Sequence, residues 1–490
     1  MAYEQLKKYR IGILLLSFLV SVTFYIVFLY PHFSVDSYNY TGHYPVVNFF
    51  TNGRPITFAF LNILSFINLD YEVAFFLSTF LAIVIISISS YVVFLTLLSR
   101  KEKWSKLNVA ILVLSVILLF NNVFMGALFL FPEVILPYSF GILLCSLAFR
   151  RVVNHGVTLK NSFILFLYLS MVLAIYQSFA PYFLLLTFAV IFLFPKASKQ
   201  NRCISFFWTL GIYFVSLLTN FILMRFSDGQ RTNFNLTVIK DNLVKIVKSQ
   251  EFLVLHSDNL LTSYIYVITL LVLAITFVYW CLRNAQKTSV LIGAGFFILI
   301  YLSILSPFII ANDGFITPRS IVVFMGLPSF LAVIVSLLHE DRLDKTLNFF
   351  KIISSGLLIV LVLSNFASNQ FLFANQLATN RMDKEIVLQV QNVINEYEDS
   401  VGINVNKISF IQDDAPTWSY VEANSYDVLP RSMVVDWSIM SLFKFYTGRD
   451  YTRVDMDSKV HEKYFKNQNW SQFSLEQLKI VGDTIYIALY

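Results

Sequence analysis

The residues best suited to chemistry lie in one stretch, residues 32–57, which directly follows the first long apolar segment of the chain. This stretch contains one acid, Asp36, and it ends with Arg54 placed between a glycine and a proline. A carboxylate can remove a proton from a hydroxyl group, and the guanidinium fork of an arginine fits the oxygens of a phosphate. Together they suit a base-assisted reaction on an anion that is carried by a lipid.

These side chains also have ordinary structural interpretations. Asp36 is followed by a serine and could cap a turn or a helix, because both residue types are frequent N-caps. Arg54 and Arg319 each stand beside a proline and could simply extend from a helix end to the membrane interface. In the functional interpretation these two arginines bind phosphate. His32 and His43 flank Asp36, and we expect both to be solvated loop histidines.

Four further polar residues come at the ends of apolar segments: Glu133, Tyr176, Gln177 and Asp313. Glu133 could bond a sugar hydroxyl, act as a second acid, or favour the first turn of a helix through its charge. Tyr176 and Gln177 could reach sugar hydroxyls or close a turn between two short helices. Asp313 stands in Asn-Asp-Gly, which favours a turn. Ionisable residues near membrane depth are costly, which makes them candidates for function.

The elements that position these residues are apolar helices. Apolar residues make up 57% of the 490-residue chain and charged residues 13%, whereas soluble domains average about 25% charged residues. Repeated apolar runs near the length of a bilayer predict a polytopic α-helical membrane protein with about eleven spans. The predicted spans are residues 11–30, 73–98, 107–124, 134–149, 161–175, 179–194, 204–224, 261–282, 288–310, 320–338 and 352–372.

Lysine and arginine concentrate in alternate short loops, which predicts a cytoplasmic N-terminus and an extracytoplasmic C-terminal segment. The net charge of +6 is therefore a signal of topology and does not indicate binding to nucleic acid. The apolar segment 56–69 is too short to span, and a span there would break the charge pattern. We expect it to form an interfacial or re-entrant helix.

The composition divides the chain into two predicted domains. Residues 1–373 form the membrane domain, with outer loops at 31–72 and 225–259, and the second loop contains an amphipathic surface helix. Residues 374–490 are more polar and predict a small extracytoplasmic α/β domain. Its expected elements are strands 407–411, 478–481 and 484–488, the last two joined as a hairpin, and a helix at 434–446.

Several common motifs are absent from the sequence. It contains no P-loop, no dinucleotide-binding glycine fingerprint and no His-Glu-x-x-His motif. Its three cysteines do not have the spacing of a zinc site. We therefore expect no cofactor and no metal. The free energy for a transfer reaction would come from a lipid-phosphate-linked donor, because soluble nucleotide sugars are not available outside the cell.

The chain resembles membrane glycosyltransferases of the GT-C superfamily and, within it, the type II glucosyl transferase family of bacterial O-antigen glucosylation. The resemblance rests on the loop with Asp36, on Gly-Arg at Arg54, on Pro-Glu at Glu133, on Tyr-Gln at Gln177, and on Pro-Arg at Arg319. It covers roughly residues 10–340. Many GT-C proteins have a pair of neighbouring acids in the first loop, and this chain has one.

The resemblance implies a membrane enzyme of the bacterial cytoplasmic membrane and its cell envelope. Its donor would be polyprenyl-phosphate glucose or a similar hexose, and its acceptor a cell-envelope glycan. A donor synthase and a small flippase are the implied protein partners. Transfer would be inverting, with Asp36 as general base and with Arg54 and Arg319 stabilising the leaving phosphate.

Three other functions stay open on the sequence alone. An envelope polysaccharide polymerase or ligase would use arginines of the long outer loop, Arg225 and Arg231. A lipid-linked sugar flippase or transporter would carry charges at mid-bilayer depth and often internal repeats. A non-catalytic scaffold would tolerate substitutions at Asp36, Arg54 and Arg319.

Overall fold

The structure is a computed structural model of the chain. It describes residues 10–41, 47–67, 70–101, 103–155, 158–192, 199–226, 235–255, 263–284, 287–309, 318–338, 345–411, 432–435, 437–466, 468 and 473–489. The chain divides into two compact units. The first unit comprises Met1–Tyr30, Val46–Phe129 and Val134–Gln370, and the second comprises Pro31–Pro45, Leu130–Glu133 and Phe371–Tyr490.

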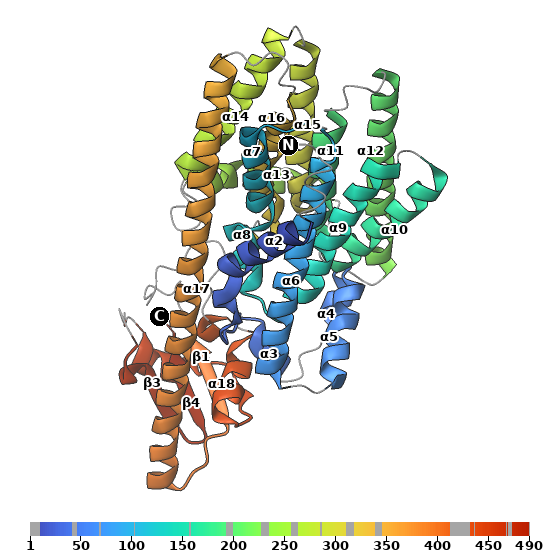
Figure 1. The fold of residues 1–490 in the computed structure, drawn as a ribbon. Helices are drawn as coiled ribbons and strands as arrows, with labels where there is room; N and C mark the ends of the chain where they lie inside the picture. Colours follow the sequence, from blue (N-terminus) through green and yellow to red (C-terminus); the bar gives the residue numbers. More distant parts are fainter. Residues whose placement is uncertain are drawn as a thin grey trace. The chain divides into compact units, whose positions relative to one another are not determined.

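All the elements of the first unit that the structure describes are helices, and Figure 1 labels its α-helices. Its elements are α2 (Arg10–Tyr25), η1 (Ile26–Leu29), α4 (Val47–Thr51), α5 (Pro55–Ile67), α6 (Tyr71–Leu98), α7 (Lys106–Phe120), α8 (Val123–Phe129), α9 (Ile135–His155), α10 (Leu159–Ile175), η2 (Gln177–Phe179), α11 (Ala180–Phe192), α12 (Lys199–Phe226), α13 (Leu236–Leu255), α14 (Ser263–Arg283), α15 (Lys287–Ile309), η3 (Pro318–Ser320), η4 (Val322–Met325), α16 (Gly326–Leu337) and the first part of α17 (Lys345–Val401).

Eight helices of the described residues have the length and apolar composition needed to cross a membrane. They coincide with eight of the predicted spans. Three shorter apolar helices, Leu159–Ile175, Gln177–Val190 and Val322–Leu337, coincide with the other three. The fourth short helix, Pro55–Ile67, is the segment expected at the interface. The helices are those of a polytopic membrane protein, and the total of about eleven spans stays a prediction.

Burial separates the central helices of this unit from the outer ones. Every residue of α16 is buried, and it packs against α7, α11 and α14. By contrast, α12 and α15 expose large apolar side chains, such as Phe207 (68% exposed) and Leu291 (76% exposed). Exposed apolar faces on long helices are favourable in hydrocarbon and unfavourable in water, as expected for a helical bundle in a membrane.

The second unit contains a small mixed sheet. Its elements are α3 (Ser37–Thr41), the last part of α17, β1 (Lys407–Ile411), η5 (Ser432–Val434), α18 (Ile439–Thr447), β2 (Thr452–Arg453), α19 (Ser458–Val460), η6 (His461–Phe465), η7 (Leu475–Gln477), β3 (Leu478–Val481) and β4 (Thr484–Ala488). The strand order is β2-β1-β4-β3; β1 runs parallel to both of its neighbours, and β3 and β4 form an antiparallel hairpin. The three predicted strands are therefore present at the expected residues.

The predicted boundary between residues 373 and 374 falls inside a helix. Figure 1 shows α17 as one uninterrupted helix, and it is 57 residues long. The two units divide within it, between Gln370 and Phe371. The change from apolar to polar composition in this region is therefore a change of environment along one helix and not a break in the chain.

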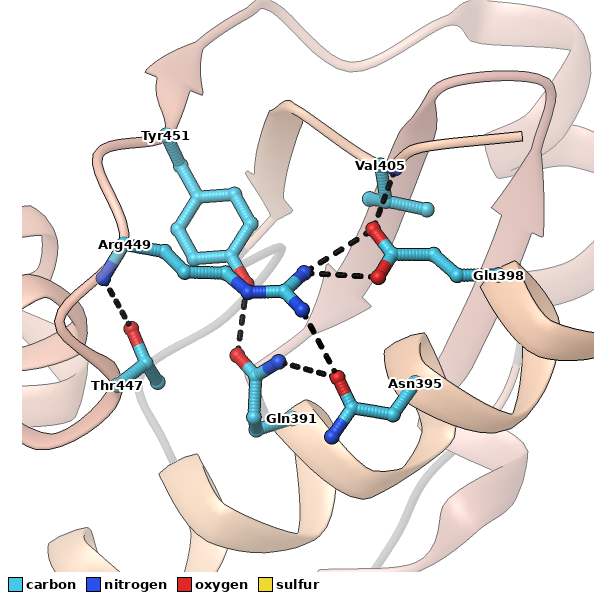
Figure 2. Close-up of polar contacts among 7 residues, drawn as sticks. All are labelled: Gln391, Asn395, Glu398, Val405, Thr447, Arg449 and Tyr451. Carbon is cyan, nitrogen blue, oxygen red and sulfur yellow. Dashed lines mark hydrogen bonds and ion pairs between the residues drawn. The ribbon is translucent and has the colours of Figure 1, made fainter. Parts of the chain in front are cut away.

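A polar network attaches the end of α17 to the segment after α18 (Figure 2). Arg449 Nη1 contacts both carboxylate oxygens of Glu398, at 3.0 and 2.9 Å, and its Nη2 donates to Asn395 Oδ1 at 3.1 Å. The hydroxyl of Tyr451 donates to Gln391 Oε1 at 2.7 Å. Charge-assisted bonds of this kind give α17 a defined attachment to the chain that leads into β2.

Candidate functional site

The turn that carries Asp36 is built from two serines. Asp36 N donates to Ser34 Oγ at 3.1 Å, and Ser37 N, in the first residue of α3, donates to Ser34 O at 3.2 Å. Between residues 32 and 39 every residue is buried except Asp36, which is half-buried. The fold therefore presents this carboxylate from an otherwise enclosed loop.

Glu133 is brought to this turn from a distant part of the chain. Ser34 Oγ lies 3.0 Å from Glu133 Oε1, and Ser37 Oγ lies 2.8 Å from Glu133 Oε2. The two serine hydroxyls lie 3.0 Å from each other. Glu133 is only 2% exposed, and the structure thus places both predicted acids, Asp36 and Glu133, in one cluster of the second unit.

The protonation state of Glu133 follows from its surroundings. Burial, and then the nearby Asp36 carboxylate, raise the pKa of Glu133 from 4.5 to about 8. The hydroxyls of Ser34 and Ser37 both donate to the carboxylate and act in the opposite direction, but burial outweighs them. With a pKa of about 8, Glu133 is mostly neutral near pH 7.

A residue that the sequence did not single out contacts Asp36. Trp437 Nε1 donates to Asp36 Oδ1 at 3.1 Å. Trp437 stands just before α18, and α18 is bonded to α3 by Ser441 Oγ, which donates to Asn39 Oδ1 at 2.7 Å. The signal that could have found Trp437 is a tryptophan in the polar, predicted extracytoplasmic part of the chain.

A second cluster, in the first unit, gathers Arg54, Tyr138, Tyr176 and Gln177. Arg54 Nε lies 3.4 Å from Gln177 Oε1, and its Nη1 lies 3.3 Å from the Tyr138 hydroxyl. The guanidinium carbon is 4.5 Å from the centre of the Tyr176 ring, which stacks on Tyr138 at 4.6 Å. Within the described residues, no carboxylate forms an ion pair with Arg54. Its positive charge is held by neutral groups, an arrangement suited to binding an anion.

The loop that carries Arg54 is shaped by Gly53 and Gln177. Gly53 has φ +72°, a left-handed conformation, and a Cβ there would meet the side chain of Met224. Gln177 Nε2 donates to the carbonyl oxygens of Asn52 and Gly53, each at 3.1 Å. Gln177 thus holds both the loop backbone and the guanidinium of Arg54. Tyr138, at the start of α9, is a member of this cluster that the sequence did not predict.

The other residues singled out in the sequence lie outside these two clusters or outside the described residues, except His32, which is next to the turn of Asp36. Arg319 lies half-buried in η3, which packs against α8 in the first unit. Asp313, like His43, lies outside the described residues. The expectation of a solvated His32 was wrong: its side chain is 3% exposed and meets the Phe373 ring edge-on at 5.3 Å, because the loop is enclosed on both sides of Asp36.

A protein-family model described as Glucosyl transferase GtrII matches residues 25–336, more than half of the chain. The chain belongs to this family. Membership confirms the resemblance to the type II glucosyl transferases and makes the protein a multi-pass membrane enzyme that transfers glucosyl groups. The matched residues include Asp36, Arg54 and Glu133, and they end before Trp437. No curated protein and no solved structure matches the chain.

Proposed function

We propose that this GtrII-family enzyme moves a glucosyl group from a polyprenyl-phosphate donor to a hydroxyl group of a cell-envelope glycan. The observation that carries the proposal is the pair of carboxyl groups in one cluster. Asp36 is half-exposed, whereas Glu133 is buried and has a raised pKa. Two neighbouring carboxyl groups in different environments are typical of acid–base sites.

In the proposed reaction Asp36 is the general base. It takes the proton of the acceptor hydroxyl while that oxygen forms a bond to the anomeric carbon of glucose. The bond from the anomeric carbon to the phosphate oxygen breaks, and polyprenyl phosphate leaves with the bonding electrons. Configuration at the anomeric carbon is inverted. Phosphate is a weak base and can leave as an anion, so the reaction needs no general acid.

The leaving phosphate gains negative charge, and we assign Arg54 and Arg319 to its stabilisation. Arg54 supports this role best, because its guanidinium has no carboxylate partner among the described residues and stacks on Tyr176. Fixed cationic donors stabilise developing charge without reorganising during the reaction. Tyr176 and Gln177 position this arginine, and Asp313 stays a candidate substrate contact.

Glu133 acts as a positioning residue in this proposal. Its carboxyl group accepts hydrogen bonds from the hydroxyls of Ser34 and Ser37, and this shapes the turn that presents Asp36. Because it is neutral, it also adds no second negative charge next to the base.

The setting of the reaction is also part of the proposal. The site would face the outside of the bacterial cytoplasmic membrane, with the N-terminus in the cytoplasm and the C-terminal part outside. The donor would be made on the inner side by a synthase and turned outward by a small flippase. The basic residues of alternate short loops support this orientation.

The test is glucosyl transfer by the purified full-length protein in detergent, with polyprenyl-phosphate glucose as donor. Asp36→Asn should lower the rate by about 10²-fold to 10⁴-fold, because it keeps the shape of the side chain and removes the base. Asp70→Asn is the matched control: Asp70 is exposed at the N-cap of α6. A chelator in parallel reactions tests for a metal. Wild-type rates in Asp36→Asn would reject Asp36 as the base.

A further inference from the structure

Trp437 has two features that a purely structural role in the fold does not require. Its side chain is 57% exposed, although tryptophan usually gains stability from burial. Its Nε1, the single polar atom of the ring, donates to Asp36 Oδ1 at 3.1 Å. The hydrogen bond fixes the edge of the indole against the candidate base and leaves much of the ring open to solvent.

The position of Trp437 is set by the residues that follow it. Ser438, the N-cap of α18, and Ile439, its first residue, are buried, at 0% and 2% exposed. The hydroxyl of Tyr446, further along α18, lies 3.2 Å from that of Tyr38 in α3. Together with the bond from Ser441 to Asn39, these contacts hold α18 against the turn that carries Asp36. The exposed indole is therefore held in place on a fixed element.

We propose that Trp437 is the platform on which the acceptor sugar stacks, so that a hydroxyl group at the rim of the sugar ring meets Asp36. One face of a pyranose ring is made of C–H groups, and it matches the flat apolar face of an indole in size. The hydroxyl groups project from the rim of the sugar, as the Nε1–H does from the rim of the indole. The acceptor is then a neutral pyranose with one open apolar face.

This inference rests on the proposed function and extends it to acceptor choice. Trp437 lies beyond residues 25–336, the part that matches the family model. The base thus belongs to the part of the chain that is shared with the family, whereas the platform belongs to the C-terminal part. Specificity for the acceptor would change with the C-terminal part while the transfer chemistry stays the same.

The experiment compares wild-type protein with Trp437→Ala and Trp437→Phe, and with Leu475→Ala as control, since Leu475 is 59% exposed in the same unit. Full-length proteins in detergent receive polyprenyl-phosphate glucose. Methyl glycosides of glucose, galactose, rhamnose and N-acetylglucosamine serve as acceptor probes, and water is the smallest acceptor. Transfer to each glycoside and hydrolysis of the donor are measured separately.

Trp437→Ala should raise the KM for the glycoside about tenfold, the loss expected for one aromatic stacking contact. Trp437→Phe keeps a ring and should retain most of the affinity. Donor hydrolysis should stay at the wild-type rate in Leu475→Ala, and in both Trp437 variants it should fall less than transfer to the glycoside does, because both lose only the hydrogen bond to Asp36 in that reaction. In a separate titration with the glycosides, wild-type protein should show a fluorescence change that Trp437→Phe lacks.

Other results would contradict the proposal that Trp437 is the platform for the acceptor sugar. If both variants lower transfer and hydrolysis equally, Trp437 only orients Asp36. If neither variant changes the KM and the fluorescence titration shows no difference, Trp437 does not contact the acceptor. A wild-type protein that neither transfers glucose nor hydrolyses the donor would overturn the proposed function itself, and the platform with it. That failure is distinguishable, because it appears before any variant is compared.

Discussion

At the scale of single residues, the two carboxyl groups of the candidate site differ in the water that surrounds them. Glu133 is enclosed by the turn of residues 34–37, and Asp36 is the one residue between 32 and 39 that is not buried. Desolvation disfavours the charged form of a carboxyl group, and a neighbouring negative charge adds to that effect. Two carboxyl groups of the same chemistry thus differ in state: Glu133 is mostly neutral, whereas Asp36 is accessible to a substrate.

The raised pKa of Glu133 predicts how stability changes with pH. Its pKa in the folded protein, about 8, lies above the unfolded value of 4.5, so the folded state holds this proton more tightly. The resulting stabilisation is complete below the unfolded pKa and is lost as the pH rises through the folded pKa. Thermal unfolding in detergent from about pH 5 to pH 8 should therefore show wild type losing stability relative to Glu133→Gln. Parallel curves for the two proteins would contradict the assignment of a neutral Glu133.

At the scale of elements, the loop between α4 and α5 is fixed by hydrogen bonds from Thr57 and Gln177 and by the backbone conformation of Gly53. Thr57 Oγ1 in α5 donates to Ile175 O at the end of α10 at 3.0 Å. Gln177 bonds the loop backbone, and Gly53 adopts a conformation that favours glycine. The position of the Arg54 guanidinium therefore depends on how α5, α10 and η2 pack together.

Gly53→Ala tests this dependence. An alanine side chain is strained in this left-handed conformation, so the free energy of unfolding should fall by about 1–2 kcal/mol. The new Cβ would also push against Met224 and displace Arg54, so the KM for the polyprenyl-phosphate donor should rise. Thermal unfolding and donor kinetics measure the two effects.

Gly211→Ala is the matched control for that substitution. Gly211 lies in α12, and a Cβ there meets nothing within 4 Å. Alanine in a helix interior is more favourable than glycine. An unchanged donor KM in Gly53→Ala, with lowered stability, would show that Arg54 does not bind the donor.

At the scale of the whole molecule, the number and direction of the spans decide where the chemistry happens. The described helices account for each predicted span, eight of them at full membrane length and three as shorter helices. The orientation rests on the basic loops and stays a prediction. It places Asp36 and the C-terminal part on the same, outer, side of the membrane.

Thiol labelling in intact cells measures that orientation. In a background with the three native cysteines replaced by serine, Leu475→Cys should react with a membrane-impermeant reagent. Lys103→Cys, which is also exposed but lies in a basic loop, should react only after the cells are opened. The reverse pattern would place the C-terminal part in the cytoplasm and reject the proposed setting.

The sequence by itself determined the class of protein and many local elements. Apolar runs predict the helices, because each run must satisfy its backbone hydrogen bonds internally. Alternating apolar residues and the Gly-Asp turn predict the hairpin of β3 and β4, at the bounds that the structure has. Side-chain type also identified four candidates, because polar groups near membrane depth are costly and are therefore candidates for function. They are Asp36, Glu133, Arg54 and Gln177.

Only the tertiary structure decided which of these residues meet. The bonds from Ser34 and Ser37 to Glu133, and from Trp437 to Asp36, join segments that are far apart in the chain. Local periodicity carries information about neighbours within a few residues, whereas these contacts depend on how whole elements pack. The neutral state of Glu133 and the role proposed for Trp437 have the same origin, because burial and hydrogen-bond partners exist only in the folded chain.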